Sequence, residues 1–221
     1  MPVSIIEKIQ ARKGIRLWEG YGLTEVGPNN FLADGKPGTV GGPMPHVDVK
    51  LMARGGEEAA PGQEGELLLR GEHMCAGYWR KPEATAEAIR DAWFHTGDLA
   101  RIDGDGHVSI VGRKKDMIIS GGINIYPAEV EKAIESHPRV AAAAVIGVPD
   151  EKWGEVGKVV LELKQGENLT PAELQAFLGD RLGRYKIPKY SVVVKELPRT
   201  VSSGKVQKFL LKERHGKPNN E

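Results

Sequence analysis

The sequence predicts an α+β fold in two parts, a β-rich first part followed by a small α+β domain. The chain has 221 residues, enough for one large domain or two smaller ones. Its 28 glycines exceed the typical ~7% of a chain, and they cluster in turns between short strand patterns up to Gly112. After Gly112, strand patterns alternate with helical ones. We therefore expect domains over 1–112 and 117–221, joined by a hinge at 113–116.

The first part consists mainly of predicted strands. Apolar spacing and the stop signal Gly14 indicate an N-terminal helix. The turn Asp103-Gly104-Asp105-Gly106 between two apolar runs favours a hairpin. We expect the strands of 30–112 to form a small distorted barrel or sandwich. The expected elements are a helix over 2–13, strands over 15–18, 47–52 and 66–70, a helix over 82–90, and strands over 99–102 and 107–111.

The second part alternates between the two kinds of element. Thr170 and Glu173 form a capping box, with Pro171 at the first helical position and an apolar stripe behind it. The continuous apolar run over 140–148 is typical of a buried strand. The expected elements are strands over 116–120, 140–148, 158–163 and 191–195, and helices over 127–136, after Thr170, and over 206–212.

Composition excludes several classes of protein. Lys and Arg total 31 against 30 Asp and Glu, so the net charge is +1 and a general nucleic-acid-binding surface is not expected. No apolar run is long enough to cross a membrane. Cys75 is the one cysteine, so no internal disulfide can form, which fits a reducing, cytoplasmic compartment. The six histidines lack zinc-ligand spacing, and no Gly-x-Ser-x-Gly elbow supports a hydrolase.

The first motif that suggests chemistry is the glycine-rich loop around Tyr21. Gly22 lets the backbone approach a ligand closely, and the Tyr21 ring offers a stacking face for a flat base. Thr24 offers a hydroxyl for a phosphate, and Glu25 offers a hard oxygen for Mg²⁺. The alternative interpretation is an ordinary glycine turn with a core tyrosine.

Two further motifs carry charge suited to a nucleotide. Asp98, which follows His95-Thr96-Gly97, can accept hydrogen bonds from the vicinal hydroxyls of a ribose. The run Arg113-Lys114-Lys115 offers cations for phosphate or ribose oxygens. The alternatives are an ordinary turn aspartate and a solvated run of charge.

Two glycine-containing loops lie in the second part. Gly121 and Gly122 allow a thin, flexible chain to pass close to the backbone. Lys205, in a Thr/Ser/Gly loop, can place an ammonium at a developing negative charge. The spacing around Lys205 is not that of a Walker loop. The alternatives are a tight turn and a surface lysine.

In this order and spacing, the motifs resemble those of the adenylate-forming, AMP-binding enzymes, and specifically the acyl-CoA synthetases (fatty-acid–CoA ligases). The resemblance runs from Gly20 to Lys208 and is most specific over 121–131. One departure is Lys208, where relatives often carry Arg. The resemblance also includes Glu66–Gly71, Gly77-Tyr78-Trp79 and Trp93–Asp98.

The resemblance implies a two-step ligase reaction with ATP, Mg²⁺ and coenzyme A. A carboxylate, expected to be that of a fatty acid, attacks the α-phosphate of ATP and releases pyrophosphate. The C-terminal domain then swings, and the CoA thiol attacks the acyl carbon, giving a thioester and AMP. The implied partners are these small molecules, with no nucleic acid, and a homo-oligomer is left open.

The resemblance also assigns residues to the adenylation step. Tyr21, beside Gly22, matches the ring that stacks on adenine. Thr24 matches the α-phosphate contact and Glu25 the Mg²⁺ ligand. Lys205 matches the lysine that stabilises charge during adenylation.

The remaining matches concern the ribose, the hinge and the thiol. Asp98 resembles the acceptor of the ribose diol, with Arg113 as a second ribose contact. Lys115 occupies the position of the interdomain hinge. Gly121 and Gly122 match the loop that lines the pantetheine path.

The family's phosphate loop, rich in Ser, Thr and Gly and ending in Pro-Lys-Gly, is not found in these 221 residues. The sequence therefore predicts the C-terminal portion of such an enzyme, inactive in isolation. The alternative is a non-catalytic nucleotide- or CoA-binding module or partner subunit. A peptide-synthetase adenylation domain or a luciferase has less support from the residues.

Overall fold

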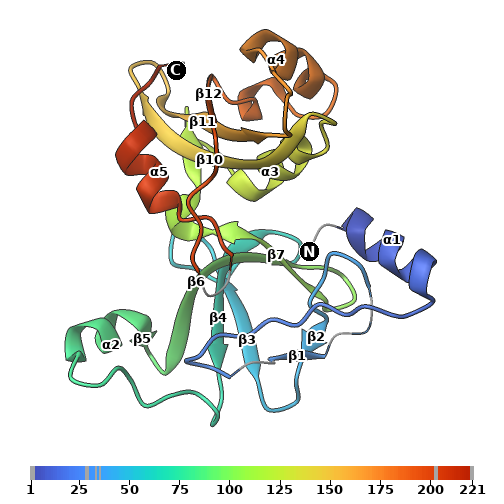
Figure 1. Cartoon of the computed structure of the whole chain (residues 1–221). Coiled ribbons are helices and arrows are strands. Elements are labelled where there is room, and N and C mark those ends of the chain that lie inside the picture. Colours follow the sequence, from blue (N-terminus) through green and yellow to red (C-terminus); the bar gives the residue numbers. More distant parts are fainter. Residues whose placement is uncertain (1–2, 28–29, 33, 35, 202–203, 220–221) are drawn as a thin grey trace. The chain divides into compact units, whose positions relative to one another are not determined.

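The computed structural model describes residues 3–27, 30–32, 34, 36–201 and 204–219 (Figure 1). The chain divides into two compact units, Met1–Lys114 and Lys115–Glu221. This division falls within the stretch where the sequence predicts a hinge. In the part of the chain that the structure describes, no helix has the length and apolar character needed to cross a membrane.

The first unit opens with helix α1, Val3–Lys13. Gly14 ends this helix with φ of 64°, and its N–H donates to the carbonyl of Gln10 at 2.9 Å. The strand expected over 15–18 is wrong. Ile15 and Trp18 are both exposed, and none of the described strands pairs with this segment. An apolar run without a partner has no ladder to join, so it remains irregular.

A five-stranded antiparallel sheet forms the body of the first unit. Its strand order is β3-β4-β6-β5, and β7 also pairs with β6, on the side opposite β4. The hairpin between β6 and β7 lies where the sequence predicts it. The bounds are β3 Asp48–Met52, β4 Glu64–Arg70, β5 Ile89–Arg90, β6 Trp93–Ile102 and β7 Val108–Arg113, with a separate pair, β1 Phe31–Leu32 and β2 Gly42–Pro43.

This sheet is open among the described residues, so the expectation of a barrel is not met in its closed form. Leu67 and Leu69 of β4 are fully buried at the centre of the core. Helix α2, Pro82–Ala88, ends two residues before the expected position. Its continuation, Ile89–Arg90, pairs with β6 instead.

The second unit is a second five-stranded sheet with helices packed against it. Strand order is β10-β11-β8-β9, and β12 runs parallel to β11. Strand β9, absent from the sequence-based expectation, pairs with β8 across Gly121-Gly122. The bounds are β8 Ile118–Ser120, β9 Ile123–Ile125, α3 Pro127–Glu135, β10 Val140–Asp150, β11 Gly154–Leu163, α4 Pro171–Gly179, β12 Tyr190–Val194 and α5 Lys208–His215, with short 3₁₀ turns at Lys114–Asp116 and Arg184–Lys186.

Helices α3, α4 and α5 bury their apolar stripes on this sheet. Val130 and Ile134 of α3 and Leu178 of α4 are fully buried in one core cluster. Leu211 of α5 belongs to a second cluster. The predicted capping box is present, because the Thr170 side chain accepts from the Glu173 N–H and Glu173 reaches back to the Thr170 N–H. The α+β fold class is thus confirmed.

Candidate functional site

The loop around Tyr21 is a closed turn in the first unit. The Leu23 N–H donates to the Gly27 carbonyl at 3.1 Å, and the Val26 N–H donates to the Leu23 carbonyl at 3.2 Å. Gly27 has φ of 80°, which favours glycine at this position. Val26 is buried as the anchor of the turn, whereas Thr24 is exposed. The turn therefore leaves the Thr24 side chain open to solvent.

Tyr21, Asp98 and Arg113 meet in one cluster, although 77 residues separate the first two. The Tyr21 hydroxyl donates to Asp98 Oδ2 at 2.6 Å. Arg113 Nε lies 3.0 Å from Asp98 Oδ1, and the Asp98 carboxylate is almost fully buried. Burial, followed by the hydrogen bond to Asp98, raises the pKa of Tyr21, so its hydroxyl stays protonated and donates.

Thr96 supports this cluster, a role that the sequence reasoning did not assign. Its hydroxyl donates to the Leu67 carbonyl at 2.7 Å and accepts from the Asp98 N–H at 3.0 Å. The bulge between Glu66 and Leu68 in the β4–β6 ladder lies beside this contact. The Thr-x-Asp spacing is the signal that could have indicated a side-chain turn at this position.

The Asp98 carboxylate keeps acceptor capacity beyond its two contacts with described residues. Each carboxylate oxygen has two lone pairs, and the protein uses one position on each oxygen of Asp98. The remaining positions suit two vicinal hydroxyls. The Tyr21 ring is held at its hydroxyl end and by an edge contact with Phe31, with centroids 5.7 Å apart. A ring fixed in this way is a rigid surface for a flat base.

Glu25 lies next to Tyr78, not in the Asp98 cluster. The Tyr78 hydroxyl donates to Glu25 Oε1 at 2.7 Å, and this bond, with some burial, raises the pKa of Tyr78 to about 12. The Glu25 carbonyl accepts from the Cys75 N–H at 2.8 Å. Among the described residues no hydrogen-bond donor faces Glu25 Oε2. A carboxylate with one oxygen held in place and the other open can supply one of the several oxygen ligands that Mg²⁺ takes.

The charged run after β7 has two different environments. Lys114 Nζ donates to the buried carboxylate of Glu66 at 2.7 Å. Burial alone would raise the pKa of Glu66, but hydrogen bonds with Lys114 and His95 outweigh it and hold the pKa below its usual value. Lys115 is exposed in the 3₁₀ turn that follows. The structure thus ties Lys114 to the first unit, and Lys115 begins the second.

In the second unit, Gly121 and Gly122 form the tight turn between β8 and β9. Their φ values are 56° and 83°, so both need glycine. The Gly121 N–H donates to the Trp153 carbonyl at 2.8 Å, and a Cβ on Gly121 would lie 2.7 Å from the Trp153 ring. Gly121 and Trp153, with Tyr185, line a cavity of about 540 Å³. This volume is within the range of ligand sites.

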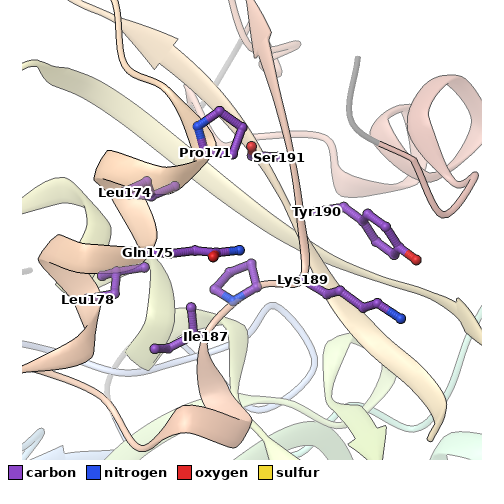
Figure 2. Close-up of a pocket in the computed structure, with 9 residues that line it drawn as sticks. Pro171, Leu174, Gln175, Leu178, Ile187, Lys189, Tyr190 and Ser191 are labelled. Atoms are coloured by element: carbon purple, nitrogen blue, oxygen red, sulfur yellow. The ribbon is translucent and has the colours of Figure 1, made fainter. Parts of the chain in front are cut away.

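A smaller crevice adjoins this cavity between α4 and β12. Figure 2 shows Gln175 of the helix extending toward the strand, whereas the Tyr190 ring points away from the helix. Its volume is only about 10 Å³, which is about one water molecule. The crevice is therefore a packing gap, and the larger cavity is the candidate ligand site.

Lys205 is exposed on the loop between β12 and α5. The loop is closed by the Thr200 N–H, which donates to the Lys205 carbonyl at 2.8 Å, and by the Arg199 guanidinium, which donates to the Gly204 carbonyl at 3.2 Å. Lys208, three residues later, has its side chain in an ion pair. Its ammonium lies 2.7 Å from Glu131 of α3, and its side chain is only 20% exposed. Of these two lysines, Lys205 is therefore the one presented to solvent.

One other cluster could suggest a metal. Asp103, Asp105 and His107 bring their ligand atoms within 4.8 Å of one another at the β6–β7 turn. The Lys36 ammonium, however, lies 2.7 Å from Asp103 and 3.1 Å from Asp105. A cation of the protein itself thus bridges the two carboxylates, and we interpret the cluster as a structural ion-pair network.

Two family models match the chain. The AMP-binding enzyme model matches residues 1–79, and the model of the AMP-binding enzyme C-terminal domain matches residues 129–205. Feruloyl-CoA synthase from Amycolatopsis is 47% identical over 92% of this chain and 42% of its own length. Long-chain-fatty-acid–CoA ligase from Bacillus subtilis is 42% identical over 96% of this chain and 39% of its own length. The chain thus spans about two fifths of the length of these curated relatives.

Solved structures agree with this assignment. The o-succinylbenzoate CoA synthetase of Bacillus subtilis, in complex with its acyl-adenylate intermediate, has a TM-score of 0.87 and 35% identity over 96% of this chain and 44% of its own. ATP-bound MatB from Rhodopseudomonas palustris has a TM-score of 0.86 and 36% identity, and the match covers 97% of this chain and 43% of its own. The architecture is therefore that of the adenylate-forming enzymes. The chain belongs to the AMP-binding enzyme family, its curated relatives include acyl-CoA ligases, and the resemblance seen in the sequence is confirmed.

Proposed function

We propose that this chain is part of an acid–thiol ligase that adenylates a carboxylic acid with ATP and transfers the acyl group to coenzyme A. The observation that carries the proposal is the cluster of Tyr21, Asp98 and Arg113. It places a fixed aromatic ring beside a buried carboxylate that still has acceptor positions for a diol. That combination suits an adenosine, as in the neighbours solved with ATP or an acyl-adenylate.

In the first half-reaction, a carboxylate oxygen of the acid attacks the α-phosphorus, and the bond to pyrophosphate breaks. The Tyr21 ring stacks on adenine, and Asp98 with Arg113 holds the ribose. The exposed Thr24 hydroxyl contacts the α-phosphate beside Gly22. Glu25 holds Mg²⁺, which when bound offsets phosphate charge. Lys205 adds an ammonium where negative charge develops.

In the second half-reaction, the CoA thiol loses its proton and attacks the acyl carbon, and AMP leaves. We assign the thiol path to the turn of Gly121 and Gly122. The 540 Å³ cavity supports this assignment, because Gly121 lines it together with Trp153 and Tyr185. Both aromatic side chains are about half exposed, at 47% and 50%, so they offer apolar surface to a slender ligand.

We propose that the mobile domain adopts two arrangements, one for each half-reaction. We assign residues 117–221 to this domain and residues 1–112 to the part against which it moves. The proposed pivot is Lys115 within the linker 113–116. It is exposed in a single 3₁₀ turn, whereas Lys114 is tied to Glu66. A hinge needs only a few such residues at the end of an element.

The nature of the acid and the compartment belong to the proposal. We expect a fatty acid, in keeping with the Bacillus subtilis long-chain-fatty-acid–CoA ligase, and feruloyl-CoA synthase makes an aromatic acid the alternative. A cytoplasmic location rests on the single Cys75 alone. A panel of fatty and aromatic acids, assayed with the enzyme that contains this chain, decides between the two classes of acid.

The test of the ligase function uses a chimera. Residues 1–221 replace the matching segment of the Bacillus subtilis long-chain-fatty-acid–CoA ligase, and ATP–pyrophosphate exchange and thioester formation are measured. We expect both activities. A folded chimera without exchange, beside an active parent enzyme, would contradict the assigned nucleotide residues.

We also propose that the 221-residue polypeptide alone does not form acyl-adenylate, because its sequence holds no Ser/Thr/Gly-rich phosphate loop ending in Pro-Lys-Gly. Positioning and charge stabilisation supply most of the catalysis in such transfers. Robust exchange by the polypeptide alone would overturn this statement. Binding of AMP or CoA without exchange would favour the alternative, a non-catalytic binding module.

A further inference from the structure

Asn30 is a fully buried polar residue that hydrogen-bonds through its backbone N–H and carbonyl and through side-chain Nδ2 and Oδ1. Its N–H donates to the Tyr21 carbonyl at 3.1 Å, and its carbonyl accepts from the Met44 N–H at 3.1 Å. Its side-chain Nδ2 donates to the Gly27 carbonyl at 3.0 Å. Its Oδ1 lies 2.8 Å from His73 Nε2. Asn30 therefore holds both ends of the 21–27 turn.

These partners fix the proton on His73. The Gly27 carbonyl can only accept, so the Asn30 amide nitrogen must face it and Oδ1 must face His73. His73 Nε2 must then carry the proton and donate. The other ring nitrogen, Nδ1, is buried and has no partner among the described residues. A buried nitrogen without a partner lowers stability, and the side-chain hydrogen bond of this ring among the described residues is the one from Nε2 to Asn30.

The segment after β4 is shaped to carry that histidine. A Cβ on Gly71 would lie 2.5 Å from the His73 ring, so glycine leaves the space that the ring occupies. Two residues after His73, the Cys75 N–H donates to the Glu25 carbonyl at 2.8 Å. The segment 71–75 thus contacts the turn directly at Glu25, and through Asn30 at Tyr21 and Gly27.

We propose that Asn30 and His73 are positioning residues for the nucleotide turn, acting through Tyr21 and Glu25 without touching the substrate. The inference rests on the proposed function, because it gives the turn its ligand. Loss of the His73 donor leaves Asn30 Oδ1 unpaired in the core. The Asn30 side chain then has reason to rotate away from Gly27, and the turn opens.

The first experiment needs no nucleotide and uses the 221-residue chain. ¹⁵N NMR of the imidazole should show His73 as the Nε2-protonated tautomer at neutral pH. Hydrogen exchange of the Leu23 and Asn30 amides should be faster in His73→Leu by roughly 5- to 50-fold, the effect of one lost buried partner. His73→Gln restores an N–H donor and should return exchange to within about twofold of the original rate. His46→Leu is the matched control, because it removes the neighbouring ring, which makes no hydrogen bond to the turn among the described residues.

The second experiment uses the active chimera. His73→Leu should raise KM for ATP in the exchange assay by roughly 5- to 50-fold, and His73→Gln should not. The rate of thioester formation from supplied acyl-adenylate at saturation should stay within about twofold in both variants. This split distinguishes positioning of the nucleotide turn from a general loss of folded protein.

The outcomes separate the two proposals. Faster amide hydrogen exchange in His73→Leu, with no ATP–pyrophosphate exchange by any chimera, would support the role of His73 in positioning the turn. The same result would reject the nucleotide function. Normal nucleotide use in all variants, with unchanged amide exchange, would overturn the positioning role alone. Equal damage from His73→Leu and His73→Gln would overturn it too, since the N–H donor would then be irrelevant.

Discussion

The Tyr21 hydroxyl should stabilise the first unit more than any exposed tyrosine hydroxyl does. It donates at 2.6 Å to Asp98, whose side chain is only 6% exposed. A hydrogen bond to a charged, buried acceptor contributes about 1.5–3 kcal/mol. Tyr21→Phe removes only the hydroxyl and leaves the ring, so the free energy of unfolding should fall by that amount. For a unit of 114 residues, this corresponds to a Tm lower by roughly 6–12 °C.

Tyr78→Phe is the matched control. Its hydroxyl also donates to a carboxylate, that of Glu25 at 2.7 Å, but Tyr78 is 36% exposed. Water competes for such a bond, so the loss should be about 0–1 kcal/mol. Differential scanning calorimetry and urea unfolding of the 221-residue chain measure both variants, with the transition of the second unit as an internal reference.

The pH dependence supplies an independent check. The folded-state pKa of Tyr21 is raised above its unfolded value by burial and by Asp98. The contribution of Tyr21 is therefore complete below about pH 10, its unfolded pKa, and is lost as pH rises toward the folded pKa. The stability difference between the original chain and Tyr21→Phe should shrink above about pH 10. Equal, small losses in Tyr21→Phe and Tyr78→Phe, or a difference that does not vary at high pH, would refute the reasoning.

Three further predictions concern Lys205, the proposed pivot Lys115 and the ion pair of Glu66 with Lys114. In the chimera, Lys205→Ala should slow adenylation by on the order of 10²–10³ and spare thioester formation from supplied acyl-adenylate; equal damage to both half-reactions would argue against this division. Lys115→Pro fixes φ near −65° and should spare only one half-reaction in the same two assays, whereas normal rates in both would remove Lys115 as pivot. Glu66→Gln should lower the stability of the first unit at neutral pH. Because the folded-state pKa of Glu66 is lowered, the stability difference between the original chain and the variant should vanish as pH falls through that pKa. A difference in urea unfolding that does not vary with pH would exclude the ion pair with Lys114.

Local sequence signals determined many of the elements. Thr170 and Glu173 specify a helix start within four residues, and the structure shows both reciprocal bonds. Asp103-Gly104-Asp105-Gly106 specifies the β6–β7 hairpin, with the Gly106 N–H bonded to the Asp103 carbonyl at 3.0 Å. Gly14 ends α1 through a single positive φ. These features are read correctly because all of their partners lie within a few residues.

Hydrogen-bonded pairing between strands determined the elements that the local signals did not. The apolar run 15–18 has strand composition but no partner among the described strands, whereas Ile123–Ile125 becomes a strand because β8 lies beside it. Residues 89–90 leave their helix for a ladder with β6. Intrinsic preference in such short runs is weak, and the available ladder bonds outweigh it.

The same division holds for the site. The sequence by itself singled out Tyr21, Glu25 and Asp98, because each lies within or directly after a short glycine-containing motif, which is a local pattern. Only the tertiary structure joined Tyr21 to Asp98 across 77 residues, paired Glu25 with Tyr78 instead, and placed His73 on Asn30 across 43. Side chains so far apart in the chain meet only when the loops that carry them pack against the folded sheet, and local sequence patterns do not encode that packing.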